Sequence, residues 1–211
     1  PQGISYSAAQ SSLSVGFGIS YTIKDVTVMI PESPQPVRVD RVEVSPFLLP
    51  LIAGKMGGKI AVHQGDGNLK ASFALGKSEG SLSFKSSKID LGKLGIFPIL
   101  ANFTGSAILN GEGSFAGDLK IPATWNGTAN ITLGKITIDA QKIQGFSVPR
   151  LNISEGVVEI MIDKGKATIK SLKLGKPGNP NDDLVAVVSG DILLGKQLDT
   201  IIKIVERRHV P

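Results

Sequence analysis

Hydrophobic side chains recur at every second position along much of this chain. Apolar residues occupy every second position of 69–75, 129–133 and 158–162, and Lys70, Ser72, Asn130, Thr132 and Glu159 lie between them. An amphipathic helix would instead repeat its apolar positions every 3.6 residues. A period of two is typical of β-strands that bury one face and expose the other to water. The chain is therefore predicted to be all-β.

Turns and bends are as frequent as strands. The 211 residues include 25 glycines and 12 prolines, which favour short elements joined by tight turns. Lys164 and Gly165 separate two alternating runs and predict a two-residue hairpin leading into 166–174. The alternation also slips its phase between Ile23 and Val26 and between 133 and 136. Such slips predict β-bulges or sharp bends that curve a sheet.

Two segments interrupt the strand pattern and predict short helices. In the first, Ser45 is a candidate N-cap, Pro46 the first helical residue and Gly54 the end. In the second, Asp90 is a candidate N-cap. The run 198–205 fits helical spacing, but its β-branched residues favour a strand. We expect a strongly curved antiparallel sheet, as a U-shaped groove or a partly open barrel or sandwich, with two short helical segments.

The residues that carry most enzyme chemistry are scarce. Cysteine is absent and histidine occurs only as His63 and His209, which excludes disulfides, thiolate zinc sites and multi-histidine metal sites. The stretch 190–196 matches part of a phosphate-binding loop but lacks the final Ser or Thr. Carboxylates such as Glu155 and Glu159 leave a glycan hydrolase open, although nothing singles out a catalytic pair. We expect no enzyme and no catalytic, cofactor-binding or metal-binding residue.

Charge and hydropathy argue against two further classes. The net charge of +5 is dispersed, and 207–209 is the only compact basic run, so a nucleic-acid partner is not expected. The longest apolar run, 47–53, contains Pro50 and is far shorter than the ~20 residues that span a bilayer. Because the chain begins at Pro1 without a signal-peptide pattern, we expect a processed or excised fragment whose membrane anchor lies outside it.

Five segments follow one another in a distinctive order. They are RVEVSP at 41–46, GSLSFKSSKIDLGKLG at 80–95, FTGSAILNGEGSF at 103–115, GTANITLGKITI at 127–138 and LVAVVSGDILL at 184–194. This order resembles the periplasmic part of the type II secretion system protein N family (GspN). The likeness covers roughly 13–206 and consists of a rhythm of "gSLSl" and "vSGdi" strands, with no invariant catalytic residue.

This resemblance implies a non-enzymatic accessory component of the machine that secretes folded proteins across the outer membrane. Residues 1–211 would be a single periplasmic β domain, held at the inner membrane by a transmembrane helix that this chain lacks. The implied partners are other inner-membrane or periplasmic secretion components. They would dock on sheet edges or surface strands.

A second, weaker likeness covers mainly 105–194. There the strand rhythm is similar to the AsmA-like group of periplasmic proteins, whose curved sheets form apolar lipid-carrying grooves. It implies a carrier of lipid or another hydrophobic ligand, and the stretch 184–188, apolar on both faces, agrees with this. Whether the sheet is an open groove or a closed core stays open. The candidate groove or core lining is Ile131, Leu133, Val158, Ile160, Ile162, Val185 and Val187.

Overall fold

A computed structural model describes residues 5–16, 18–29, 36–48, 50, 54–95, 97–98, 104–143 and 146–193. Within them, twelve strands form one antiparallel sheet, and β10 (Gln141–Ile143) and β11 (Phe146–Val148) form a small second one. The strands of the large sheet are β1 (Ser5–Ser7), β2 (Gln10–Val15), β3 (Ile19–Met29), β4 (Val37–Pro46), β5 (Met56–Gln64), β6 (Gly67–Leu75), β7 (Glu79–Asp90), β8 (Gly105–Asp118), β9 (Asn126–Ile138), β12 (Leu151–Asp163), β13 (Lys166–Leu174) and β14 (Ala186–Leu193). A 3₁₀ turn, η1 (Pro122–Thr124), lies between β8 and β9.

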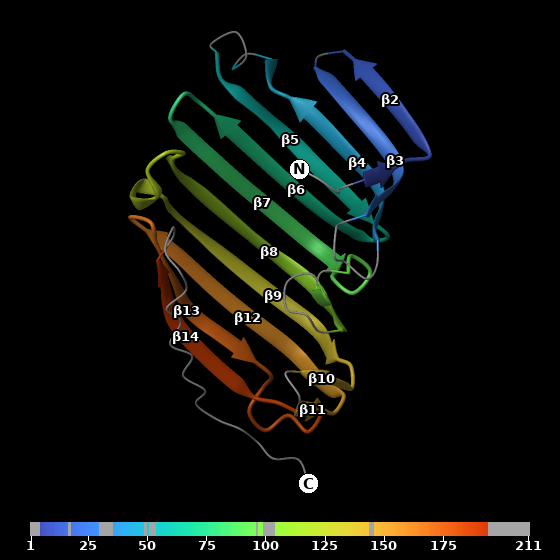
Figure 1. Ribbon diagram of the computed structural model, residues 1–211, viewed down its shortest axis with the longest axis vertical. Helices are drawn as coiled ribbons and strands as arrows, with labels where there is room; N and C mark the ends of the chain where they lie inside the picture. Colours follow the sequence, from blue (N-terminus) through green and yellow to red (C-terminus); the bar gives the residue numbers. More distant parts are fainter. Residues whose placement is uncertain are drawn as a thin grey trace.

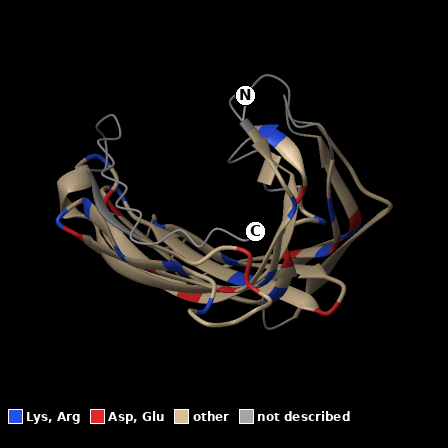
Figure 2. Cartoon of the chain, turned by 90° about the horizontal axis from the view of Figure 1, so that it is seen from below, with Lys and Arg blue, Asp and Glu red and all other residues tan. Residues whose placement is uncertain are grey.

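The large sheet is nearly a simple meander. From β3 to β9 each strand pairs with the next in sequence, and β12, β13 and β14 continue the order, as Figure 1 shows. β1 and β2 both pair with β3 at one edge. Figure 2 shows the sheet as an arc that is open on one side. The predicted all-β, strongly curved antiparallel sheet is thus confirmed, and in the described part of the chain it does not close into a barrel.

The predicted hairpin is also present. β12 ends at Asp163 and β13 begins at Lys166, which pair with each other. Both turn residues have left-handed backbones, with φ of +48° at Lys164 and +74° at Gly165. This is the conformation of a two-residue turn whose twist matches that of the flanking strands.

Three strands bend where a non-glycine residue takes a left-handed backbone. These residues are Asp25 in β3, Lys88 in β7 and Lys135 in β9, with φ of +53°, +55° and +51°. The pairing of β7 with β8 and that of β8 with β9 shift register beside Lys88 and Lys135. Leu133 and Ile136, three residues apart, consequently pack against the same buried cluster. The predicted phase slip at 133–136 is therefore a β-bulge. At the other predicted slip, Asp25 has a left-handed backbone, but the pairing of β3 with β4 keeps its register.

The helical segments differ from their predicted bounds. Ser45 and Pro46 belong to β4, where they pair with residues 59 and 58, because the ladder to β5 continues past the expected N-cap. Leu48 and Pro50 are helical. In the second segment, Asp90 Oδ1 accepts a hydrogen bond from the Lys93 N–H at 3.1 Å and so caps a turn. The run 198–205 lies outside the described residues. None of the described helices is both long and apolar enough to cross a bilayer.

The most deeply buried cluster lies at one end of the sheet. Ala107, Ile136 and Ile153, on β8, β9 and β12, are only 1%, 6% and 2% exposed. Three loop residues outside the strands pack on this cluster, namely Leu91, Phe97 and Leu184. The core is thus a cap of loops over one end of the sheet, and we call this end the covered end.

The carboxylate of Asp182 holds the loop before β14 in place. Asp182 is only 6% exposed, and it accepts hydrogen bonds from the Ser154 backbone and hydroxyl, from the Lys176 N–H at 2.7 Å and from the Asn179 amide at 2.9 Å. Burial by itself would raise the pKa of Asp182, but these hydrogen bonds outweigh it and hold the pKa below its usual value.

Glycines make room for aromatic rings on the sheet. A Cβ on Gly113 would lie 2.6 Å from Cε1 of Phe84, and one on Gly127 would lie 2.6 Å from Cδ1 of Phe115. Each ring therefore lies over a neighbouring glycine, where it covers backbone that would otherwise face solvent.

We expect Gly113→Ala to destabilise the protein by about 1–3 kcal/mol, because the new methyl group would collide with Phe84 and with the Cβ of Ala129. Gly134→Ala is the matched control, since a Cβ there has nothing within 4 Å. Replacing glycine by alanine also lowers the conformational entropy of the unfolded chain, and this stabilising effect applies to both variants. Urea unfolding measures the difference, and equal free energies of unfolding for the two variants would contradict this packing.

Asp182 is expected to make stability depend on pH. Its pKa is lower in the folded than in the unfolded state, so its contribution is complete above the unfolded value of 3.8 and is lost as pH falls through the folded pKa. Urea unfolding of the wild type should show a drop in the free energy of unfolding below pH about 4 that is smaller in Asp182→Asn. An identical pH dependence in the two proteins would refute this role.

Candidate functional site

Hydrophobic side chains from successive strands line up in rows on one face of the large sheet. Directly paired residues of antiparallel strands lie on the same face, so the register identifies the rows. One row contains Ile60, Ala71, Phe84, Gly113, Ala129 and Ile160, and the next contains Gly58, Phe73, Leu82, Phe115, Gly127 and Ile162. We call the face that carries these rows the apolar face.

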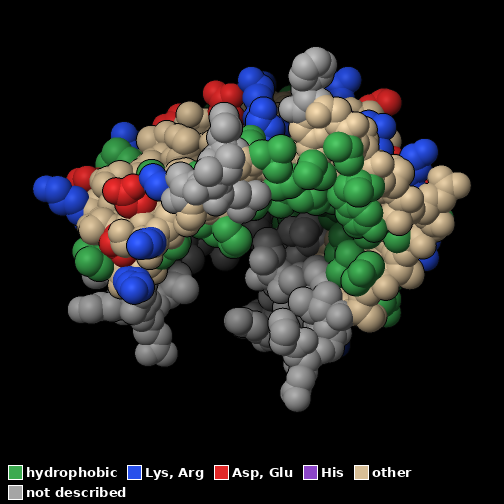
Figure 3. Space-filling model, turned by 90° about the horizontal axis from the view of Figure 1, so that it is seen from above, with side chains coloured by type: hydrophobic (Ala, Val, Ile, Leu, Met, Phe, Trp, Pro, Cys, Tyr) green, Lys and Arg blue, Asp and Glu red, His purple; other side chains and the backbone are tan. Residues whose placement is uncertain are grey.

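The apolar face is the concave one. Figure 3 shows hydrophobic side chains lining the hollow of the arc, with Lys, Arg, Asp and Glu on its outer surface. Away from the covered end, the larger side chains of the apolar face stay partly exposed, and Leu82 is 42% exposed. We call this part the open groove, and its larger side chains are Phe73, Leu82, Phe84, Phe115, Ile131 and Ile160.

Polar groups on the apolar face are few and satisfied. Gln64 is buried and exchanges two hydrogen bonds with the backbone of Asp90, at 2.9 and 3.3 Å. Ser86 is buried and donates to the Gly111 carbonyl at 3.2 Å. Among the described residues of β5 to β9 and of β12 that the register assigns to this face, none carries a charge. The open groove therefore offers hydrocarbon contact and little else.

Five of the predicted lining residues lie together on the apolar face. Ile131 pairs with Val158, and Ile160 and Ile162 follow Val158 at alternate positions along β12. Leu133 pairs with Gly156 and packs on the buried cluster at the covered end.

The other two predicted lining residues lie elsewhere. Val185 precedes β14 and is buried, at 6% exposed. Val187 pairs with Lys173 on the opposite face and is 38% exposed. The place on the apolar face belongs to its neighbour Ala186, which pairs with Leu174.

Sequence reasoning did not identify the aromatic half of the open groove. Phe73, Leu82, Phe84 and Phe115 come from β6, β7 and β8. Alternation within 69–75 already placed Phe73 on an apolar strand face. However, the pairing that joins it to Leu82 and Phe115 depends on the register between strands, for which the sequence carries no local signal.

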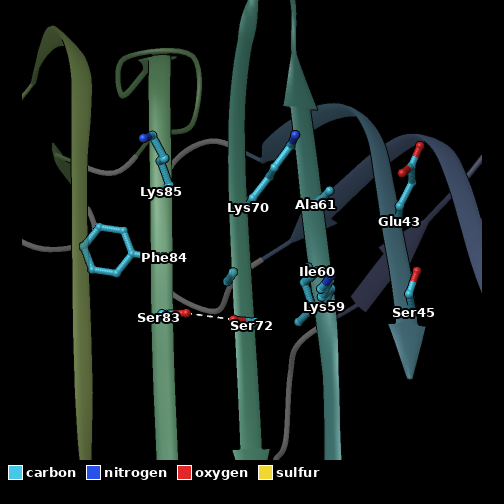
Figure 4. A pocket seen from close by; sticks show the side chains of 11 residues that line it. Glu43, Ser45, Lys59, Ile60, Ala61, Lys70, Ser72, Ser83, Phe84 and Lys85 are labelled. Carbon is cyan, nitrogen blue, oxygen red and sulfur yellow. Dashed lines mark hydrogen bonds between the residues drawn. The ribbon is translucent and has the colours of Figure 1, made fainter. Parts of the chain in front are cut away.

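The convex face carries a shallow polar hollow of about 490 Å³, which Figure 4 shows. Lys59, Lys70 and Lys85 line it, and Ser72 and Ser83 form a hydrogen bond of 2.7 Å across its floor. The Lys85 ammonium group forms a 3.3 Å ion pair with a carboxylate oxygen of Glu112. Cross-strand pairs of this kind are typical of a solvated sheet face.

Of the two histidines, His63 is the one that lies in the described part of the chain. Nε2 of His63 lies 3.2 Å from a guanidinium nitrogen of Arg41, which donates to it, on the convex face. In the same part of the chain, no group of three or more His, Cys, Asp or Glu side chains is placed to hold a metal ion.

Comparison with known proteins returned no match to any family, to any curated protein or to any solved structure.

Proposed function

We propose that the protein binds the acyl chains of a lipid, or a similar long hydrocarbon ligand, in the open groove. The observation that carries the proposal is a continuous, uncharged concave face whose large side chains stay partly exposed. Contiguous exposed apolar surface is costly in water and commonly marks a binding site. No catalytic residue is needed for this function.

The size of the open groove suits an acyl chain. From Gly127 to Leu133 along β9, six residue steps span about 20 Å. One leaflet of a bilayer has hydrocarbon about 15 Å thick, half of the bilayer core. A single acyl chain would therefore fit along the strands before it reached the cluster at the covered end.

The chemistry of the open groove favours a lipid over a peptide. The backbone groups of its strands are used in the ladders of the sheet, and the described residues of β5 to β9 and of β12 that face the open groove carry no charge. A bound peptide would bring amide groups that lose water without gaining partners, at a cost of about 1–3 kcal/mol each. An acyl chain has no such groups.

A second candidate function is the accessory role in type II secretion that the GspN resemblance implies, at the periplasmic face of the inner membrane. It is favoured by the edge strand β2, all of whose residues are exposed, including Leu13 at 65% and Val15 at 72%. An exposed edge can accept a strand from a partner. Co-purification of the anchored protein with inner-membrane secretion components would support this role, and normal secretion in a deletion strain would oppose it.

We expect Leu82→Asp to weaken binding of a fluorescent fatty acid by roughly tenfold or more. The variant removes an apolar contact worth about 1.5–3 kcal/mol and places a charge in the open groove. Because Leu82 is 42% exposed, the variant should still fold. Fluorescence titration measures the affinity, and circular dichroism checks the fold.

Ser81→Asp is the matched control, since Ser81 is the exposed neighbour of Leu82 on the other face of β7. It should bind the fatty acid like the wild type. Equal loss in both variants, or a wild type that does not bind the probe, would overturn the proposal.

A further inference from the structure

Four connections between strands lie at one end of the sheet. The start of β5 and the turns after β6, β8 and β12 all lie at the end opposite the covered end, as the pairing of Met56 with Leu75 and of Glu79 with Asp118 shows. Figure 1 shows these connections along one side of the sheet. We call this end the turn rim, and it comprises Lys55, Met56, Lys77, Leu119, Lys120, Ile121 and Lys164.

The turn rim exposes large apolar side chains. Met56, Leu119 and Ile121 are 59%, 47% and 52% exposed. A Cβ on Gly80 would lie 2.6 Å from Cδ2 of Leu119, and Gly80 pairs with Leu75 on the apolar face. The exposed side chain of Leu119 therefore continues the surface of the open groove to the end of the sheet.

The turn rim is also basic. Four lysines of the turn rim have exposed side chains, namely Lys55, Lys77, Lys120 and Lys164. Lys166, at the start of β13, lies close to Lys164 in the chain and is also exposed. The carboxylates at the same end are Glu79, Asp118 and Asp163. That of Asp118 accepts a hydrogen bond from the Lys120 backbone N–H at 2.7 Å, so it is turned toward the chain.

We infer that the turn rim docks on the surface of an anionic lipid bilayer, an inference that rests on the proposed lipid-binding function. Met56, Leu119 and Ile121 would enter the interface between headgroups and acyl chains, and the lysines would lie among the anionic headgroups. In this orientation the open groove leads away from the bilayer, so an acyl chain leaving the membrane meets apolar surface without crossing water.

The single tryptophan of the chain provides a direct readout. Trp125 lies beside η1 at this end, and its indole N–H donates to the Asp118 carbonyl at 2.9 Å. Docking should bring it close to lipid, so its fluorescence should be quenched by brominated acyl chains. The probe is phosphatidylcholine vesicles with and without phosphatidylglycerol, and flotation measures the bound fraction.

Two double variants test the two components of the turn rim. Leu119→Asp with Ile121→Asp, and Lys77→Ala with Lys120→Ala, should each lower affinity for the anionic vesicles by roughly tenfold or more. The controls make the same changes elsewhere. Tyr6→Asp with Met29→Asp alters exposed apolar residues on β1 and β3, and Lys70→Ala with Lys173→Ala alters exposed lysines on strands. Both controls should bind vesicles like the wild type.

The same proteins are titrated with the fluorescent fatty acid in solution. Wild type that binds the fatty acid but not the anionic vesicles would overturn docking and leave the proposed function standing. Wild type that fails to bind the fatty acid would defeat the proposed function itself. Equal binding to vesicles with and without phosphatidylglycerol, loss in the controls, or a dimer in solution that Leu119→Asp with Ile121→Asp dissociates would each overturn the inference.

Discussion

In-register pairing between neighbouring strands is the constraint on which the rest of this structure depends. Each inward side chain lies beside an inward side chain of the next strand, so a row such as Ile60, Ala71 and Phe84 crosses the sheet without interruption. A slip of one residue at any ladder would move that strand's hydrophobic side chains to the solvated convex face. The apolar face exists only because the ladders from β4 to β13 keep this phase.

Residues with left-handed backbones keep the hydrophobic side chains on the concave face where the pairing shifts register. At Lys135 one extra residue is absorbed in β9, so Leu133 and Ile136 can both face inward although they are three positions apart. The bend also separates two environments on one face. On one side lies the cluster around Ile153, under loops tied down by Asp182, and on the other lies the open groove.

Much of the fold could be predicted from local patterns, and the assembled site only in part. Alternation, the Lys164–Gly165 turn and the phase slip at 133–136 are local signals, and they correctly indicate strands, a hairpin and a β-bulge. The predicted start of a helix at Ser45 and Pro46 was wrong, because pairing of β4 with β5 outweighed the capping preference of Ser45. Val187 shows the same limit, since its face depends on pairing with Lys173 and not on its own hydrophobicity.

The meander order has a consequence for how such a sheet can change in length. Because nearly every strand contacts only its sequence neighbours, each hairpin is a module whose loss or gain affects just the two strands beside it. Extending the chain by one more alternating hairpin would widen the concave surface by about 10 Å, two strand spacings, and leave the existing rows in place. Capacity for larger or additional hydrocarbon chains can therefore evolve by duplicating hairpins, without redesign of a central core.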